Sequence, residues 1–250
     1  MDDPLDSLGW RAKFGVLAPS TNTIVEADFY RMAPPGVTCH MSRIHIRDMS
    51  MNSDDDFLRV ISQIRAEIAF AIERVVTCEP DYLVMGMSAE TFWGGVEGNE
   101  RFTADVSRQA GCEVATGADA CRRALEVYEA RKIAVLTPYQ KVADDNVERF
   151  FTESGYEVVG VEGLRCPSAV AIAQVTEAEL RARLIALSNL DVDAVVQVGT
   201  NLSMVRLADE AERWLGKPIV AINAATFWMA LRDNQIADKV YGAGRLLRDW

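Results

Sequence analysis

The sequence predicts an α/β protein of two similar halves, with mostly parallel sheets, helices on the sheet faces and a site between the halves. Two observations support this prediction: short apolar runs alternate with longer amphipathic segments, and two strand–loop passages each occur twice. The chain of 250 residues is long enough for one large domain or two halves. Its apolar share of 49% and charged share of 25% are typical of soluble proteins.

The elements follow from the spacing of apolar residues along the chain. Short β-rich runs predict strands at Ala12–Leu17, Val37–Ile46, Tyr82–Met85, Ile133–Leu136, Glu157–Val161, Ala194–Val198 and Ile219–Ala221. Apolar residues at helical spacing predict helices at Ile24–Met32, Asp54–Thr77, Asn99–Gln109, Ala118–Ala130, Ala143–Ser154, Glu177–Leu187, Val205–Leu215 and Ala225–Asn234.

Two passages of the sequence are repeated. Gly15–Ser20 (GVLAPS) returns as Ala134–Tyr139 (AVLTPY), 119 residues later, and Asp81–Ser88 (DYLVMGMS) returns as Asp193–Thr200 (DAVVQVGT), 112 residues later. Any two βα units share some features, but here order, spacing and residue type agree at both places. We therefore favour a duplicated βα design related by a pseudo-twofold axis.

The repeat also predicts the division of the chain and the place of the site. Residues 1–117 together with 219–250 form the first half, and residues 118–218 form the second. In open α/β sheets, ligands bind at the carboxyl ends of the strands. We expect one cleft between the halves to collect the side chains that follow these strands, namely Ser20, Asn22, Ser88, Tyr139 and Thr200.

Charge and composition exclude several classes of partner and cofactor. The net charge of −11 opposes binding to nucleic acid or anionic lipid, although local N–H donors can still bind a small anion. No apolar run is long enough for a membrane span, and the acidic start does not resemble a signal peptide, so we expect a cytoplasmic protein. The five widely spaced cysteines and two histidines favour neither disulfides nor a metal site. Neither GxGxxG nor a P-loop occurs, and we expect no cofactor.

The loop Pro19–Thr23 (PSTNT) places four hydrogen-bonding side chains directly before a helix. Helix capping accounts for one or two of them, and an anion site at the helix N-terminus accounts for all four. We favour the anion site, with Asn22 as the leading candidate because its amide donates twice without charge.

The other loops offer further donors. Ser88 can donate to a carboxylate, and Phe92 and Trp93 either wall a pocket or belong to the core. Glu90 is either a proton donor with a pKa raised by burial or, as we favour, a solvent-facing acid. Tyr139 can bind a carboxylate or deliver a proton, unless it lies at the solvent edge. The candidate catalytic residues are Ser88, Glu90, Tyr139 and Thr200. The candidate substrate-binding residues are Pro19, Ser20, Thr21, Asn22, Gly86, Met87, Ser168, Gly199 and Asn201.

These motifs resemble a known enzyme superfamily. Gly15–Glu26 (GVLAPSTNTIVE) resembles the opening of bacterial maleate cis-trans isomerases. Met85–Gly94 (MGMSAETFWG), the turn Leu136–Tyr139 and Ala225–Arg232 (ATFWMALR) resemble arylmalonate decarboxylase. Both belong to the aspartate/glutamate racemase superfamily, and the resemblance covers nearly the whole chain. It implies two pseudosymmetric flavodoxin-like halves, an active site between them and a cofactor-free enzyme that acts beside a carboxylate.

The resemblance also implies catalytic cysteines that this sequence lacks. In the isomerases a cysteine from each half acts on the substrate, and in the decarboxylase one cysteine protonates a carbanion. The corresponding positions fall in Gly86–Ser88 and at Gly199, and no cysteine lies in either loop. Isomerisation or racemisation by a thiolate therefore lacks its catalytic groups. A hydroxyl cannot replace them without a base, because an alcohol is far less acidic than a thiol.

We therefore expect a lyase that acts on a small di- or keto-carboxylate through an enolate-like intermediate. One alternative is an isomerase, hydratase or hydrolase with a non-cysteine catalyst, and another is a carboxylate-binding protein without activity. The expected partner is a small carboxylate rather than nucleic acid or membrane, with a homo-oligomer possible.

Overall fold

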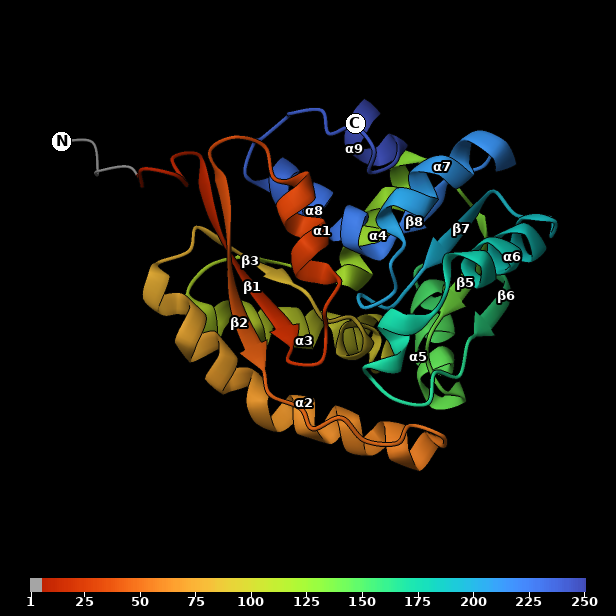
Figure 1. Cartoon of the computed structure of the whole chain (residues 1–250), viewed down its shortest axis with the longest axis horizontal. Helices are drawn as coiled ribbons and strands as arrows, with labels where there is room; N and C mark the ends of the chain where they lie inside the picture. Colours follow the sequence, from red (N-terminus) through yellow and green to blue (C-terminus); the bar gives the residue numbers. More distant parts are fainter. Residues whose placement is uncertain (1–5) are drawn as a thin grey trace.

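Two parallel four-stranded sheets form the framework of the computed structural model, which describes residues 6–250 (Figure 1). The first sheet has the order β2-β1-β3-β4, and the second has the order β6-β5-β7-β8. The first contains β1 (Ala12–Pro19), β2 (Val37–Ile44), β3 (Tyr82–Met85) and β4 (Val114–Ala115). The second contains β5 (Lys132–Thr137), β6 (Glu157–Gly163), β7 (Ala194–Gln197) and β8 (Ile219–Ala221). All neighbouring strands are parallel.

Helices connect the strands and cover the sheets. Those of the first half are α1 (Val25–Met32), α2 (Asp54–Val75) and α3 (Gly95–Ala110), with the short helices η1 (Val76–Cys78) and η2 (Ala89–Phe92). After α4 (Gly117–Val127) come α5 (Lys141–Glu153), η3 (Ala171–Gln174), α6 (Glu177–Ser188) and α7 (Val205–Leu215). The chain ends with α8 (Ile222–Asp233) and α9 (Arg245–Asp249).

Local sequence explains where several helices begin and end. The side chains of Ser53, Thr116 and Thr176 accept backbone N–H bonds at the first turns of α2, α4 and α6, as N-cap residues do. Gly111 and Gly216 end α3 and α7 with positive φ angles of 75° and 68°, a conformation that glycine adopts without steric cost. These signals fix the lengths of the connections between the strands.

The predicted fold class is confirmed. Each half has the same strand order, and β1 and β5 occupy equivalent central positions in the two sheets. The sequence did not predict β4 or α9, because two residues and five residues are too short to show a periodic pattern. It also placed residues 219–221 in the first half, whereas β8 pairs with β7 in the second sheet. By sheet membership, the chain therefore leaves the second half only after Ala221.

The two halves share a common core. Helices α4 and α8 pack on each other near the middle of the molecule (Figure 1). Phe227 of α8 is fully buried and contacts the rings of Phe14 on β1 and Phe29 on α1. Phe92, which follows β3, packs on Phe150 of α5 and so joins the halves directly. No helix within residues 6–250 has the length and apolarity needed to cross a bilayer.

We predict that Phe227→Ala destabilises the whole molecule, because it opens a cavity between the last helices and the first sheet. The expected loss in the free energy of unfolding is about 3–5 kcal/mol. Urea unfolding followed by circular dichroism measures it. The control is Phe70→Ala on α2, where the side chain is 52% exposed and the expected change is within about 0.5 kcal/mol. Equal effects of the two substitutions would contradict the assignment of Phe227 to the core.

Candidate active site

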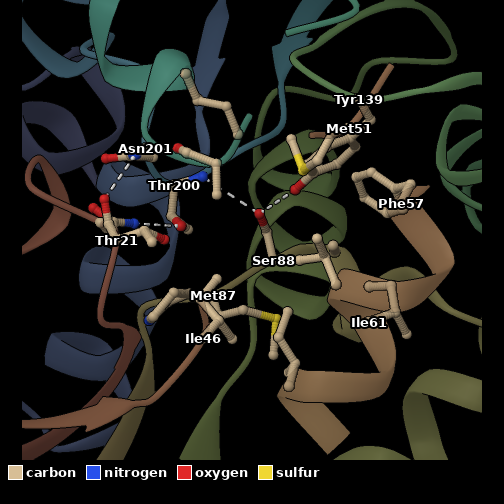
Figure 2. A pocket seen from close by; sticks show the side chains of 17 residues that line it. Thr21, Ile46, Met51, Phe57, Ile61, Met87, Ser88, Tyr139, Thr200 and Asn201 are labelled. Carbon is tan, nitrogen blue, oxygen red and sulfur yellow. Dashed lines mark hydrogen bonds between the residues drawn. The ribbon is translucent and has the colours of Figure 1, made fainter. Parts of the chain in front are cut away.

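A cavity lies between the halves, at the carboxyl ends of the central strands (Figure 2). Both sheets contribute to it, since Asn22 and Ser88 follow β1 and β3, while Tyr139 and Thr200 follow β5 and β7. Its lining consists of Pro19, Thr21, Asn22, Ile46, Met51, Phe57, Val60, Ile61, Ile64, Met87, Ser88, Ala89, Tyr139, Ala169, Ile172, Thr200 and Asn201. The space suits a small ligand rather than a polymer.

Ser88 is at the centre of the polar end of the cavity, between Tyr139 and Thr200 (Figure 2). Its Oγ lies 2.6 Å from the Tyr139 hydroxyl, and it accepts a hydrogen bond of 3.3 Å from the backbone N–H of Thr200. One hydroxyl hydrogen is used between Ser88 and Tyr139, whichever of them donates. The second hydroxyl hydrogen remains available to a ligand in the cavity.

The surroundings of Tyr139 keep its phenol neutral and in place. Burial raises its pKa, so the hydroxyl keeps its proton at neutral pH and acts as a donor. Phe57 packs edge-on against the ring, with centroids 5.4 Å apart. The Tyr139 backbone N–H donates to Thr137 Oγ1 at 3.1 Å, and Thr137 in turn bonds the buried Asp144. Arg165 pairs with Asp144 and also donates to the Tyr139 carbonyl.

Thr200 connects the second half to the loops of the first half. Its Oγ1 donates to the carbonyl of Gly86 at 3.0 Å and accepts from Asn22 Nδ2 at 3.0 Å. The preceding Gly199 has a φ of 105°, and a Cβ atom there would lie 2.5 Å from the Pro138 ring. The backbone at position 199 therefore requires glycine, and any larger residue forces the Pro138 turn to move.

Asn22 has a structural role in addition to facing the cavity. Its Oδ1 accepts the backbone N–H groups of Ile24 and Val25, each at 3.0 Å, at the start of α1. The N–H of Thr23 donates to Asn201 Oδ1 at 3.0 Å. These helix N–H groups were expected to bind an anion, but they already have acceptors within the protein. One hydrogen of the Asn22 amide remains for a ligand, because the other is bonded to Thr200.

Two backbone N–H groups that follow β3 are further candidate donors. Met87 and Ser88 are buried residues that line the cavity. Within residues 6–250, neither backbone N–H group has a hydrogen-bond acceptor. Because buried N–H groups are nearly always paired, these two are suited to an oxyanion that enters the cavity.

The opposite side of the cavity is apolar. Helix α2 contributes Phe57 and Ile61, with Val60 and Ile64, and the segment before it contributes Ile46 and Met51 (Figure 2). The residues that line the cavity include no lysine, arginine, histidine, cysteine or acid. A bound carboxylate would therefore meet neutral donors at one end and a dry wall at the other.

Several expected site residues lie outside this cavity. Ser20 Oγ bridges the backbone N–H and carbonyl of Ile46, and Ser168 Oγ accepts the N–H of Ala171 at the start of η3. Gly86 and Gly199 shape the loops without lining the space. Glu90 is buried rather than solvent-facing, and it pairs with Arg65 at 2.7 Å. Burial raises the pKa of Glu90, yet its carboxyl does not line the cavity either.

The sequence did not indicate the apolar wall, because residues of α2 at helical spacing look the same whether they face a core or a cavity. It also gave no sign of Ala169 and Ile172, which reach the cavity from the loop before η3 and from η3 itself. Such residues are recognised only when the two halves are placed against each other.

None of the five cysteines lines the cavity. Burial raises the pKa of the Cys166 thiol to about 11 and that of Cys39 to about 12, so both are protonated and unreactive at neutral pH. Across the described part of the chain, no group of three or more histidine, cysteine or acidic side chains is arranged to bind a metal.

Comparison with known proteins places this geometry in a family. The chain is 26% identical to a maleate isomerase of Pseudomonas putida over 249 residues, which cover 94% of this chain and 96% of that protein. It is 22% identical to a maleate isomerase of Nocardia farcinica over 246 residues, with 94% and 95% covered.

Solved structures show the same fold. A cysteine-to-serine variant of Nocardia farcinica maleate cis-trans isomerase, with a covalently bound succinylcysteine intermediate, has a TM-score of 0.85 at 22% identity, with 95% of this chain and 98% of that chain covered. A structure of arylmalonate decarboxylase has a TM-score of 0.78 at 20% identity, with 94% and 98% covered. The family model described as arylmalonate decarboxylase matches residues 14–247. The chain therefore belongs to the arylmalonate decarboxylase family, whose relatives include maleate isomerases.

Proposed function

We propose that this protein is a cofactor-independent lyase that decarboxylates a small di- or keto-carboxylate bearing an apolar substituent. The observation that supports the proposal is the pairing of neutral donors, centred on Ser88 and Tyr139, with the apolar wall of α2 in one small cavity. Decarboxylation requires both features. The apolar wall removes the hydration shell of the carboxylate that leaves, and the donors stabilise the negative charge that develops on the other carboxylate.

In the proposed reaction, the spectator carboxylate accepts hydrogen bonds at the polar end, from the hydroxyl pair and the N–H groups of Met87 and Ser88. The second carboxylate lies against the apolar wall. The bond between this carboxylate and the central carbon breaks, carbon dioxide leaves, and the electron pair passes into an enediolate. The donors stabilise the oxyanion, and a proton then goes to carbon either from water or from the Tyr139 hydroxyl, which in that case regains a proton from solvent.

The lack of a thiol in the cavity favours decarboxylation over isomerisation through a cysteine. The Nocardia farcinica structure contains a succinylcysteine, whereas no cysteine lines the cavity of this chain. The Gly199 conformation also leaves no room for a side chain at the position where the resemblance places one of the thiols. A hydroxyl would need a strong base to add to a double bond, and no base lines the cavity.

A second candidate is isomerisation with a non-cysteine catalyst, which the maleate isomerase relatives favour. A third is carboxylate binding without turnover. The three differ in their products: carbon dioxide from a substituted malonate, fumarate from maleate, or a thermal shift with no product.

We predict that the protein releases carbon dioxide from phenylmalonate, and that Ser88→Ala and Tyr139→Phe each lower kcat/KM about 10²–10³-fold through loss of an oxyanion donor. A coupled carbon dioxide assay measures this. Ser107→Ala on α3, where the hydroxyl bonds only the Cys112 carbonyl, is the matched control and keeps full activity. If a panel of substituted malonates gives no carbon dioxide while maleate gives fumarate, the decarboxylase proposal is wrong.

We further predict that Asn22→Ala weakens both the fold and ligand binding. Loss of the α1 cap lowers the free energy of unfolding by about 1–2 kcal/mol. The affinity for phenylacetate, a product-like probe, falls as well, because the variant lacks the free amide hydrogen. Thr176→Ala, which removes a cap from α6, costs a similar stability but leaves binding unchanged. Titration calorimetry distinguishes the two variants, and wild-type affinity in Asn22→Ala would exclude this residue from the anion site.

A further inference from the structure

A buried acid lies behind the polar end of the cavity. Asp28, on the inner side of α1, is 6% exposed and forms no ion pair among the described residues. Its Oδ2 accepts a hydrogen bond of 2.9 Å from Asn223 Nδ2, at the first turn of α8. The proposed chemistry does not use Asp28, so its burial needs another explanation.

Asn223 connects this acid to the site. The same Nδ2 also donates to the carbonyl of Thr200 at 3.0 Å, so both amide hydrogens are used. Thr200 in turn bonds Ser88 and Asn22, and Asn22 caps the helix that carries Asp28. Hydrogen bonds therefore connect the acid through Asn223 and Thr200 to the donors of the cavity, and the backbone of α1 connects Asn22 back to Asp28.

One polar atom of Asn223 lacks a partner. Asn223 Oδ1 is buried and accepts no hydrogen bond within residues 6–250. An ionised Asp28 cannot satisfy it, because a carboxylate only accepts. A neutral Asp28 carries an O–H that can donate to Asn223 Oδ1 while its other oxygen accepts from Nδ2. Donors and acceptors of the resulting pair are complementary. The second amide hydrogen of Asn223 still donates to the carbonyl of Thr200.

The electrostatic surroundings favour the neutral form. Burial raises the pKa of Asp28 to about 6, against the lowering effects of the Asn223 hydrogen bond and of Arg31. Glu26, on the same helix, is paired with Arg43. The ionisable groups on the two elements that pack against α1 are Cys39, His40 and Arg43 on β2 and Arg232 and Asp233 on α8. None of them forms a hydrogen bond with Asp28, and those of α8 lie in its last turn.

We propose that Asp28 is a positioning residue whose neutral acid form pairs with Asn223 to hold Thr200 in place, and that an anion in the cavity draws a proton from solvent onto Asp28. The coupling to an anion rests on the proposed function of the cavity as a carboxylate site. Anion binding is then tighter when Asp28 is protonated, and it weakens as the pH rises through the pKa of about 6.

The Asp28→Asn variant tests this proposal, because asparagine supplies a permanent N–H to Asn223 Oδ1 and carries no charge. In the wild type, we expect the Kd for phenylacetate to rise by up to roughly tenfold per pH unit between pH 6 and pH 8. In Asp28→Asn we expect a Kd for phenylacetate that does not change with pH and equals the low-pH value of the wild type. Calorimetry in two buffers of different ionisation enthalpy should show proton uptake on binding in the wild type and none in the variant.

Glu212→Gln is the matched control. Glu212 is a buried acid on α7 whose pKa is also raised by burial, but it bonds Tyr128 and the backbone of the C-terminal segment rather than the site. We expect this variant to keep the wild-type pH dependence of phenylacetate binding. A flat profile in Glu212→Gln would show that any buried acid has this effect, which overturns the specific role of Asp28.

A ligand-free measurement keeps this test separate from the proposed lyase activity. Because burial raises the pKa of Asp28 from its ordinary value of 3.8 to about 6, its contribution to stability is lost as the pH rises from the first value to the second and does not change further above it. Urea unfolding between pH 4 and pH 7 should therefore show that the wild type loses stability relative to Asp28→Asn up to about pH 6. Parallel pH profiles of the two proteins, or phenylacetate binding without proton uptake, or no phenylacetate binding at any pH, would overturn the proposal. Absence of carbon dioxide release would overturn only the lyase activity.

Discussion

The hydrogen bonds of Thr200 hold the two halves together at the site, and the rest of the cavity depends on them. Thr200 belongs to the second half, yet its N–H, hydroxyl and carbonyl bond Ser88, Gly86 and Asn223 of the first half or of α8. The Gly199 conformation directs the chain into this position, where a Cβ atom would meet Pro138. Because both halves supply donors to one point, the site forms only when the common core between them is packed.

The proposed anion site contains no cation. The donors are hydroxyl, amide and backbone N–H groups, and apolar residues of α2 line the opposite side. Fixed neutral dipoles in a dry site stabilise developing charge without reorganisation when the reaction occurs. A lysine or arginine in the same place would bind the carboxylates of the substrate more tightly. It would therefore stabilise the transition state by a smaller amount relative to the bound substrate. Burial keeps Tyr139 protonated and raises the pKa of Asp28 behind the site.

Much of the fold was predictable, since the repeat of Gly15–Ser20 at Ala134–Tyr139 marks equivalent strand ends in two sheets of the same order. The strand-end rule also brings Ser88 and Tyr139 into one cavity. It does not indicate which way each side chain points. Ser20 follows β1 just as Tyr139 follows β5, yet Ser20 turns to the backbone of Ile46. The Asp28–Asn223 pair joins residues 195 positions apart and could not be predicted without the packing of α1 on α8.

The central claim is that neutral donors from both halves bind a carboxylate while α2 contacts its apolar substituent. A crystal structure with bound phenylacetate tests it most directly. The account predicts carboxylate oxygens within hydrogen-bonding distance of the Ser88–Tyr139 pair and of the N–H groups of Met87 and Ser88, with the ring against Phe57 and Ile61. A carboxylate bound instead at a surface arginine, with the cavity filled by water, would contradict it.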